Sequence, residues 1–193
     1  MPIATIFVSS LLPLCEGARD RNMATVYTIG HSTREGGEFA AILTAYGIQT
    51  LVDVRRMPTS RHVPQFNAEA LESRLREHGI DYLHTAELGG RRHTSKDSVN
   101  LAWKNLSFRG YADYMQTSEF ASGLEKVIAL AEQRTIAIMC AEAVPWRCHR
   151  SLVGDALLAR GLTVIDILDG RNRRPHVLTP FARISDGRVT YPE

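Results

Sequence analysis

The sequence is poor in several features, and each scarcity narrows the class of protein. Three cysteines among 193 residues, with no framework spacing, exclude a secreted disulfide scaffold and lead us to expect a cytoplasmic protein. No apolar run is long enough to cross a bilayer, so we expect no membrane association. The net charge of +2 is too small to indicate a nucleic-acid-binding protein by itself.

Lysine is scarce as well, and arginine takes its place. Only Lys96, Lys104 and Lys126 are lysines among 23 basic residues, so the other 20 are arginines. Arginine suits bidentate binding of phosphate or carboxylate. A GC-rich genome favours arginine codons and would give the same bias, so the positions of the arginines are more informative than their number.

The length and composition fit one domain. A chain of 193 residues with 44% hydrophobic and 23% charged residues can bury one sizeable core. Residues 1–14 are mildly apolar but lack a basic start, and the charged stretch 15–22 follows, which argues against a signal peptide. We expect residues 1–23 to be an extension outside the fold, with Met23 as an alternative start, and residues 24–193 to form a single α/β domain.

Apolar residues at helical spacing alternate with short apolar runs. Three amphipathic stretches end at Gly47, Gly79 and Gly161, and an apolar residue follows each, so a helix is expected to end there and a strand to begin. The short runs predict strands at 26–29, 50–54, 82–83, 136–139 and 164–168. This alternation predicts a Rossmann-like three-layer α/β/α domain with a mainly parallel sheet. Residues 91–115 are interpreted as a long inserted loop after the third strand.

Basic or polar residues fill the four loops that follow the expected strands, at 30–34, 53–61, 88–93 and 140–150. Because the carboxyl ends of parallel strands share one edge of a sheet, we expect these loops to converge. Like charges brought together repel one another unless an anion joins them, so a phosphate-bearing ligand is predicted there. For any single loop, a solvated basic turn is the alternative. The predicted anion-binding residues are Ser32, Arg55, Arg56, Arg61, Arg91, Arg147 and Arg150.

The loop at 140–150 also carries residues suited to catalysis. Cys148 is expected in the first turn of the next helix, where the helix dipole lowers the pKa of a thiol. It is the first candidate for a nucleophile, with a structural thiol as the alternative, whereas Cys140 is more typical of the core. Glu142 is either a general base, an orienting partner of a histidine, or an ion-pair partner of a nearby arginine. The predicted catalytic residues are Cys148, His31, Glu142 and His149.

The spacing of these residues bears on three known kinds of site. Cysteine phosphatases and rhodaneses need five residues between Cys and Arg, whereas six separate Cys140 from Arg147. The tripeptide 148–150 resembles the alkyl-acceptor motif of DNA alkylguanine transferases, but three residues match easily by chance. A metal site built from Cys140, Cys148, His149 and His31 lacks a zinc-ribbon spacing, so no metal ligands are predicted. The sequence requires no cofactor and leaves its identity open.

Aromatic and basic residues interleave within the expected insertion. Trp103, Phe108 and Tyr111 could stack on nucleobases while neighbouring basic residues bind phosphates. The alternative is that these rings anchor a long loop onto the core. If the segment folds over the basic edge of the sheet, it would complete a nucleotide site.

Taken together, the motifs resemble those of a bacterial family of unknown function, the domain-of-unknown-function family 488. The motifs occur in the family's order between about residues 27 and 168, and are Ile29-Gly30-His31-Ser32, Val52-Asp53-Val54-Arg55 with Pro58 and Ser60-Arg61, Leu88-Gly89-Gly90-Arg91, Phe108-Arg109-Gly110-Tyr111, and Cys140-Ala141-Glu142 with Cys148-His149-Arg150. The resemblance implies one intact domain and supports these site residues. It implies no particular reaction, because the family has no settled activity.

Three functions remain open on the sequence. The first is an enzyme that acts on a nucleotide, a nucleic acid or a phosphorylated small molecule, with the arginines binding the anion. The second is a non-catalytic nucleic-acid-binding protein, in which the same arginines contact the backbone. The third is a thiol redox or metal-binding protein that uses Cys140 and Cys148.

Overall fold

A six-stranded sheet runs through the protein in the order β3-β2-β4-β1-β5-β6, in a computed structural model that describes residues 24–193. The expectation for residues 1–23 lies outside the described residues. The first five strands in this order pair in parallel, and β6 is antiparallel to β5. The strands are β1 (Thr25–Gly30), β2 (Thr50–Asp53), β3 (Asp81–His84), β4 (Ile136–Cys140), β5 (Thr163–Ile167) and β6 (Arg173–Pro175).

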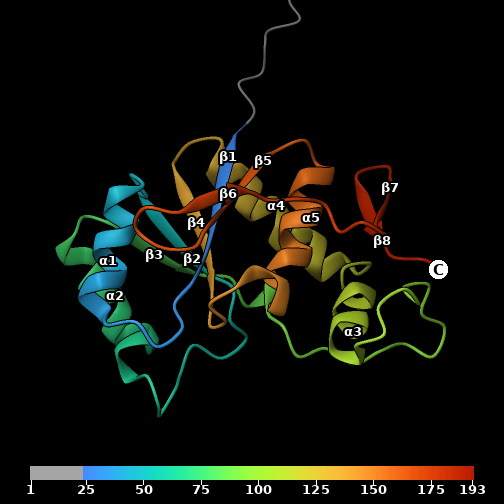
Figure 1. Cartoon of the computed structure of the whole chain (residues 1–193), viewed down its shortest axis with the longest axis horizontal. Coiled ribbons are helices and arrows are strands. Elements are labelled where there is room, and N and C mark those ends of the chain that lie inside the picture. The colour runs from blue at the N-terminus through green and yellow to red at the C-terminus, as the bar shows by residue number, and fades with distance from the viewer. Residues whose placement is uncertain (1–23) are drawn as a thin grey trace, which may run out of the picture.

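Helices cover both faces of this sheet, which confirms the predicted three-layer α/β/α architecture (Figure 1). The helices are α1 (Gly36–Ala45), α2 (Ala68–Glu77), α3 (Leu106–Tyr114), α4 (Ser118–Ala131) and α5 (Arg150–Ala159). Strand β4 contributes side chains to the hydrophobic cores on both faces of the sheet, because successive side chains of a strand point to opposite faces. Ile136 and Ile138 pack in the core beneath α4 and α5, whereas Ala137 and Met139 pack in the core beneath α1 and α2.

The three glycines predicted to end helices do so. Gly47, Gly79 and Gly161 have φ angles of 65°, 68° and 83°, the left-handed conformation that lets a chain leave a helix without strain on a Cβ. The residues that follow them return to the sheet as β2, β3 and β5. The pattern of glycine followed by an apolar residue therefore located three helix-to-strand junctions.

The strand order creates a crevice at one edge of the sheet. Strand β4 lies between β1 and β2, so β1 and β4 are neighbours whose carboxyl ends lie side by side. The chain leaving β1 enters α1 on one face, and the chain leaving β4 enters α5 on the other face. Where the chains leaving two neighbouring strands turn to opposite faces of the sheet, a crevice opens beyond the strand ends. Ligands of open α/β sheets bind in such a crevice.

The insertion is more regular than expected. Its second half forms α3, whose first turn is capped by Asn105, since the Asn105 side chain accepts hydrogen bonds from the N–H groups of Ser107 and Phe108. Tyr111 and Ala112 of α3 are buried in the same core as α4 and α5. The segment is thus attached to the domain rather than extended over it as a loop.

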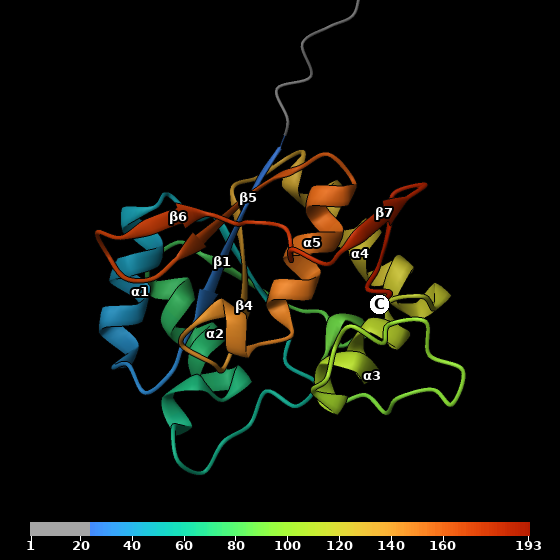
Figure 2. The same cartoon turned by 45° about the vertical axis from the view of Figure 1, so that its right-hand side comes forward.

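The C-terminal residues add a hairpin beside α5, formed by β7 (Arg183–Ser185) and β8 (Arg188–Thr190) (Figure 2). Tyr191 follows the hairpin and is completely buried. Within residues 24–193, no helix is both long and apolar enough to span a bilayer.

Candidate functional site

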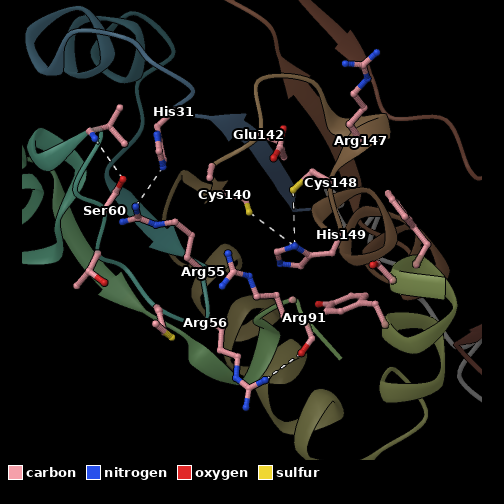
Figure 3. Close-up of a pocket in the computed structure, with 18 residues that line it drawn as sticks. His31, Arg55, Arg56, Ser60, Arg91, Cys140, Glu142, Arg147, Cys148 and His149 are labelled. Atoms are coloured by element: carbon pink, nitrogen blue, oxygen red, sulfur yellow. Dashed lines mark hydrogen bonds between the residues drawn. The ribbon is translucent and has the colours of Figure 1, made fainter. Parts of the chain in front are cut away.

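A pocket of about 510 Å³ lies at the carboxyl edge of the sheet, where the loops after β1, β2 and β4 meet the residues that precede and form α3 (Figure 3). Its lining contains most of the residues singled out from the sequence. The lining residues are His31, Arg55, Arg56, Met57, Thr59, Ser60, Val63, Gly90, Arg91, Ser107, Phe108, Tyr111, Cys140, Ala141, Glu142, Arg147, Cys148 and His149.

Two glycines let the loops approach closely enough to form this pocket. A Cβ on Gly30 would overlap the carbonyl of Glu142, so only glycine allows the β1 and β4 loops to meet there. A Cβ on Gly90 would lie 2.8 Å from Nδ1 of His149 and 3.1 Å from its Cε1. Both glycines thus set the position of the chain around the loop that holds the cysteines.

Two thiols and an imidazole form a compact cluster on the pocket wall. Cys140 ends β4, and Cys148 and His149 immediately precede α5. The Sγ atoms of Cys140 and Cys148 each lie 3.8 Å from Nδ1 of His149 (Figure 3). The opposite ring nitrogen, Nε2, lies 3.3 Å from the carbonyl oxygen of Val54. We refer to Cys140, Cys148 and His149 as the thiol–imidazole cluster.

The expected low pKa of Cys148 is wrong, and Cys140 is the more acidic thiol. Cys148 is at the start of α5 as predicted, and the backbone N–H of Arg150 donates to its Sγ at 3.5 Å. However, the interaction with the neighbouring Cys140 thiol, together with burial, raises the pKa of Cys148. The same interaction, together with the backbone of Ala141 and Glu142 and the charge of Arg150, lowers the pKa of Cys140.

His31 is buried beside the cluster and is held as a neutral ring. Its Nδ1 lies 2.8 Å from the carbonyl oxygen of Ser32, and its Nε2 lies 3.2 Å from Nη1 of Arg55. The ring also stacks on Phe66 at a centroid distance of 4.2 Å. Burial, reinforced by the charge of Arg55, lowers the pKa of His31 to about 4. At neutral pH, Nδ1 therefore donates to Ser32 and Nε2 accepts from Arg55.

Arg55 is fixed by a buried carboxylate, Asp53, for which no role was predicted from the sequence. Asp53 accepts from Nε and Nη2 of Arg55 at 2.9 and 2.6 Å, and Nη2 also donates to the carbonyl of Phe66 at 2.7 Å. The hydroxyl of Tyr82 donates to Asp53 at 2.7 Å. These contacts leave Nη1 beside His31 as the pocket-facing end of Arg55. Asp53 could have been identified from the sequence, because a charged residue at the end of an apolar strand is expected to be buried and therefore to need a partner of opposite charge.

The remaining predicted anion-binding residues fall into two groups. Arg56, Arg91 and Arg147 are exposed and line the pocket, although Figure 3 shows the side chain of Arg147 extending away from the other labelled groups. Arg56 donates to the carbonyl of Arg91 at 3.0 Å, and Arg91 adopts a left-handed φ of 59°, which is strained for a residue with a Cβ. Ser32, Arg61 and Arg150 do not line the pocket.

Arg150 has a structural position. It is completely buried, and its guanidinium donates to the carbonyls of Glu142 and Ala143. These bonds hold the loop between β4 and α5 in its shape. Glu142 itself is exposed on the pocket lining, and its carboxylate makes no ion pair among residues 24–193.

The three aromatic residues predicted to stack on bases do not form one surface. Phe108 lines the pocket and is half-buried. Tyr111 also borders the pocket, but it is buried, donates to the carbonyl of Leu88 at 2.7 Å and packs against His149. Trp103 lies outside the pocket, where it stacks on Phe108 and packs edge-on against Phe181 and Tyr191. Trp103 and Tyr111 thus anchor α3 and its preceding loop.

The comparisons with known proteins agree with the family resemblance. The family model described as "Domain of unknown function DUF488" matches residues 37–157, which is more than half of the chain and includes the loops after β2, β3 and β4. No curated protein and no solved structure matches the chain. The chain belongs to the DUF488 family, and its pocket is formed largely by residues within the part that the family model matches.

Proposed function

We propose that this protein is an enzyme that binds a phosphate-bearing substrate, a nucleotide or a phosphorylated small molecule, in the pocket at the strand ends. The observation that carries the proposal is the meeting of arginines from separate loops with the thiol–imidazole cluster in one pocket. A pocket of about 510 Å³ is within the range of about 300–1,000 Å³ that is usual for small-molecule sites.

The charges of the pocket favour an anion. Among residues 24–193, no carboxylate pairs with Arg56 or Arg91, so two exposed arginines of the lining have no counter-charge. Arg147 is also unpaired among these residues, but its side chain extends away from the other labelled groups of the pocket (Figure 3). Arg55 adds a guanidinium whose orientation is fixed in advance by Asp53. Such fixed donors bind a phosphate with less loss of side-chain freedom than mobile ones do.

The groups that could act on a bound substrate line the same pocket. Cys140 is the more acidic thiol and is the better nucleophile of the pair when no metal ion is bound to it. Glu142 is exposed to the pocket and is suited to accept or donate a proton. His31 is neutral and hydrogen-bonded on both nitrogens, so it positions Arg55 rather than moving a proton.

Non-catalytic binding of nucleic acid is supported less well. Of the three rings considered for stacking, only Phe108 is half-buried and borders the pocket, because Trp103 packs outside it and Tyr111 is buried. One available ring beside an enclosed anion site suits a single nucleotide better than a continuous strand, which needs successive stacking surfaces.

Binding is tested by thermal shift and native mass spectrometry against inorganic phosphate, nucleotides and phosphorylated metabolites. A ligand that binds the folded protein raises its melting temperature. Arg91→Ala should weaken binding of that ligand about 10- to 100-fold, since a hydrogen bond to a charged group contributes about 1.5–3 kcal/mol. Arg188→Ala, at an exposed position of β8 away from the pocket, is the matched control and should bind like the wild type.

Catalysis is tested by product analysis with the ligand found in the screen. Glu142→Gln should bind that ligand and lose turnover, whereas the exposed Glu132→Gln should retain both. If no phosphate-bearing compound stabilises the protein, or if Arg91→Ala binds it as well as the wild type does, the proposed function is wrong.

A further inference from the structure

The thiol–imidazole cluster brings together three side chains of the metal-binding type. The Sγ atoms of Cys140 and Cys148 and a ring nitrogen of His149 all lie within 4.8 Å of one another. We propose that these three side chains bind one zinc ion, with a fourth coordination position open to the pocket. This metal site goes beyond the proposed function. It does not depend on the phosphate-bearing substrate, so metal binding can be tested without one.

The spacing of the three atoms suits a tetrahedral ion. Zinc bonds of about 2.3 Å to sulfur and about 2.0–2.1 Å to nitrogen give ligand-to-ligand distances of about 3.6–3.8 Å in a tetrahedron. Both sulfur-to-Nδ1 distances in the cluster are 3.8 Å. Both sulfur-to-nitrogen distances are therefore already close to those around a bound ion. Two thiolates and a neutral imidazole also compensate the charge of the ion in a buried place.

The second nitrogen of His149 supports the same assignment. A carbonyl oxygen can only accept a hydrogen bond, so the contact of Nε2 with Val54 places the proton on Nε2. The lone pair is then on Nδ1, which faces both sulfurs. Histidine ligands of metals commonly donate their other N–H to a backbone carbonyl in this way. Tyr111 and Gly90, which contact the ring from separate segments, help to hold it in place.

A backbone N–H group donates to one sulfur of the cluster, as in thiolate sites. The N–H of Arg150 donates to Sγ of Cys148 at 3.5 Å. Such a donor stabilises negative charge on sulfur. A pair of cysteines that only formed a disulfide would need neither this donor nor an imidazole lone pair facing both sulfurs.

The fourth position is directed to the pocket because all three ligands line it. His31, the remaining residue of the metal site considered from the sequence, is not part of the cluster, since its Nε2 lies against Arg55 at 3.2 Å. Three protein ligands with one open position are typical of zinc ions that act in catalysis, whereas structural zinc sites are closed by four. A zinc-bound water or substrate oxygen would then face the arginines.

The test uses the full chain, reduced and stripped of metal with a chelator. Titration with Zn²⁺, read by native mass spectrometry, should give one ion per chain, and Co²⁺ should give thiolate charge-transfer absorption with tetrahedral ligand-field bands. Cys140→Ser, Cys148→Ser and His149→Gln should each weaken binding more than about 100-fold, since outer-shell changes alone cost about 10–100-fold. Cys15→Ser, which changes the remaining cysteine, is the control and should keep the stoichiometry.

Circular dichroism of each variant separates loss of a ligand from loss of folding, and a folded variant of the cluster that has lost the ion supports the proposal. Failure of the reduced wild type to bind either ion stoichiometrically would overturn it. So would tight binding by a folded Cys140→Ser/Cys148→Ser double variant. If the protein binds zinc but no phosphate-bearing compound stabilises it, the metal site is supported and the proposed substrate class is wrong. The failure of one proposal can therefore be told from the failure of the other.

Discussion

His31 shows how burial can turn a candidate catalytic base into a positioning residue. Its side chain is almost inaccessible to solvent and contacts a carbonyl on one nitrogen and a guanidinium on the other. A second positive charge on the ring would lie 3.2 Å from Arg55 in a poorly solvated place. The neutral ring instead accepts a hydrogen bond from Arg55 and helps to aim it at the pocket.

This environment predicts a loss of stability in mild acid. The pKa of His31 is lowered to about 4 by burial, whereas an unfolded histidine has a pKa of about 6.5. Between these pH values the unfolded chain binds a proton that the folded protein does not, so stability is fully present above pH 6.5 and falls as the pH approaches 4. Urea denaturation at several pH values measures this fall in the free energy of unfolding. Between pH 6.5 and 4, the fall should be smaller in His31→Asn than in the wild type by on the order of 2 kcal/mol.

His78→Asn is the control for that measurement, because His78 is exposed at the end of α2. Its pH profile should follow that of the wild type. A His31→Asn profile that also coincides with the wild type between pH 4 and 6.5 would show that the folded protein protonates His31 as easily as the unfolded chain does.

Asp53 gives a second prediction at the residue scale. Asp53→Asn removes the counter-charge of Arg55, which is itself buried, so the free energy of unfolding should fall by about 3–5 kcal/mol. Tyr82→Phe removes one hydrogen bond to the same carboxylate and leaves the ion pair intact, so it should cost about 1 kcal/mol. Chemical denaturation measures both. Equal losses would mean that the ion pair contributes no more than the tyrosine hydrogen bond.

Gly90 brings the loop after β3 against His149, the residue that precedes α5. An added Cβ would lie 2.8 Å from Nδ1 of His149, so Gly90→Ala must displace either the loop or the ring. We expect a loss of about 1–3 kcal/mol of stability, the usual cost of overpacking, and a weaker metal affinity of the thiol–imidazole cluster. Denaturant titration and Co²⁺ titration measure the two effects.

Gly37→Ala is the matched control for Gly90→Ala. Gly37 lies in the first turn of α1, and a Cβ there would have no atom within 4 Å. Alanine is the better helix former, so Gly37→Ala should stabilise the protein by up to about 1 kcal/mol and leave metal binding unchanged. A Gly90→Ala variant as stable as Gly37→Ala would show that the contact with His149 is easily relieved.

The sequence was most informative where hydrophobic periodicity and glycine marked the elements. The parallel strands and the turns at Gly47, Gly79 and Gly161 were predicted because apolar spacing and backbone conformation are local properties. Helix α3 was missed because its aromatic and glycine residues have poor helical periodicity. The hairpin β7–β8 was missed because most of its residues are exposed and charged, and its buried contacts are made with a distant helix.

For the site, the sequence predicts which loops meet but not which hydrogen bonds their side chains make. Parallel strands bring the loops that follow them to one edge of the sheet. This topology is why one pocket is lined by His31, Arg55, Arg91 and Cys148. Which polar groups are already engaged by the backbone does not follow from the sequence. Arg150, which is occupied by two carbonyls, could therefore not be told from a free arginine.

At the scale of the whole molecule, a buried polar network joins the C-terminal segment to the main sheet. His176, which follows β6, contacts Asp166 of β5 at 3.1 Å and Asp155 of α5 at 3.2 Å. Asp155 also accepts from the hydroxyl of Tyr191 at 2.8 Å and from the N–H of Thr179 at 3.1 Å. Both carboxylates are buried, so a protonated His176 between them compensates their charge.

This network predicts a loss of stability on the alkaline side. Burial alone lowers the pKa of His176, but the hydrogen bonds and charges of Asp155 and Asp166 outweigh it and raise the pKa to about 9. The contribution is therefore fully present below about pH 6.5, the pKa of an unfolded histidine, and is lost as the pH rises through 9. Denaturant titrations from pH 6 to 10 should show the wild type losing on the order of 3 kcal/mol.

His176→Gln should be destabilised at pH 6 and should lose most of this pH dependence, because glutamine can donate to one carboxylate but carries no charge. His78→Gln, at the exposed position, is again the control and should keep the wild-type profile. Hydrogen exchange should show the amides around Tyr191 opening earlier in His176→Gln, since Tyr191 is held by the same carboxylate. Parallel profiles of His176→Gln and the wild type above pH 7 would mean that the histidine is already neutral in the folded protein.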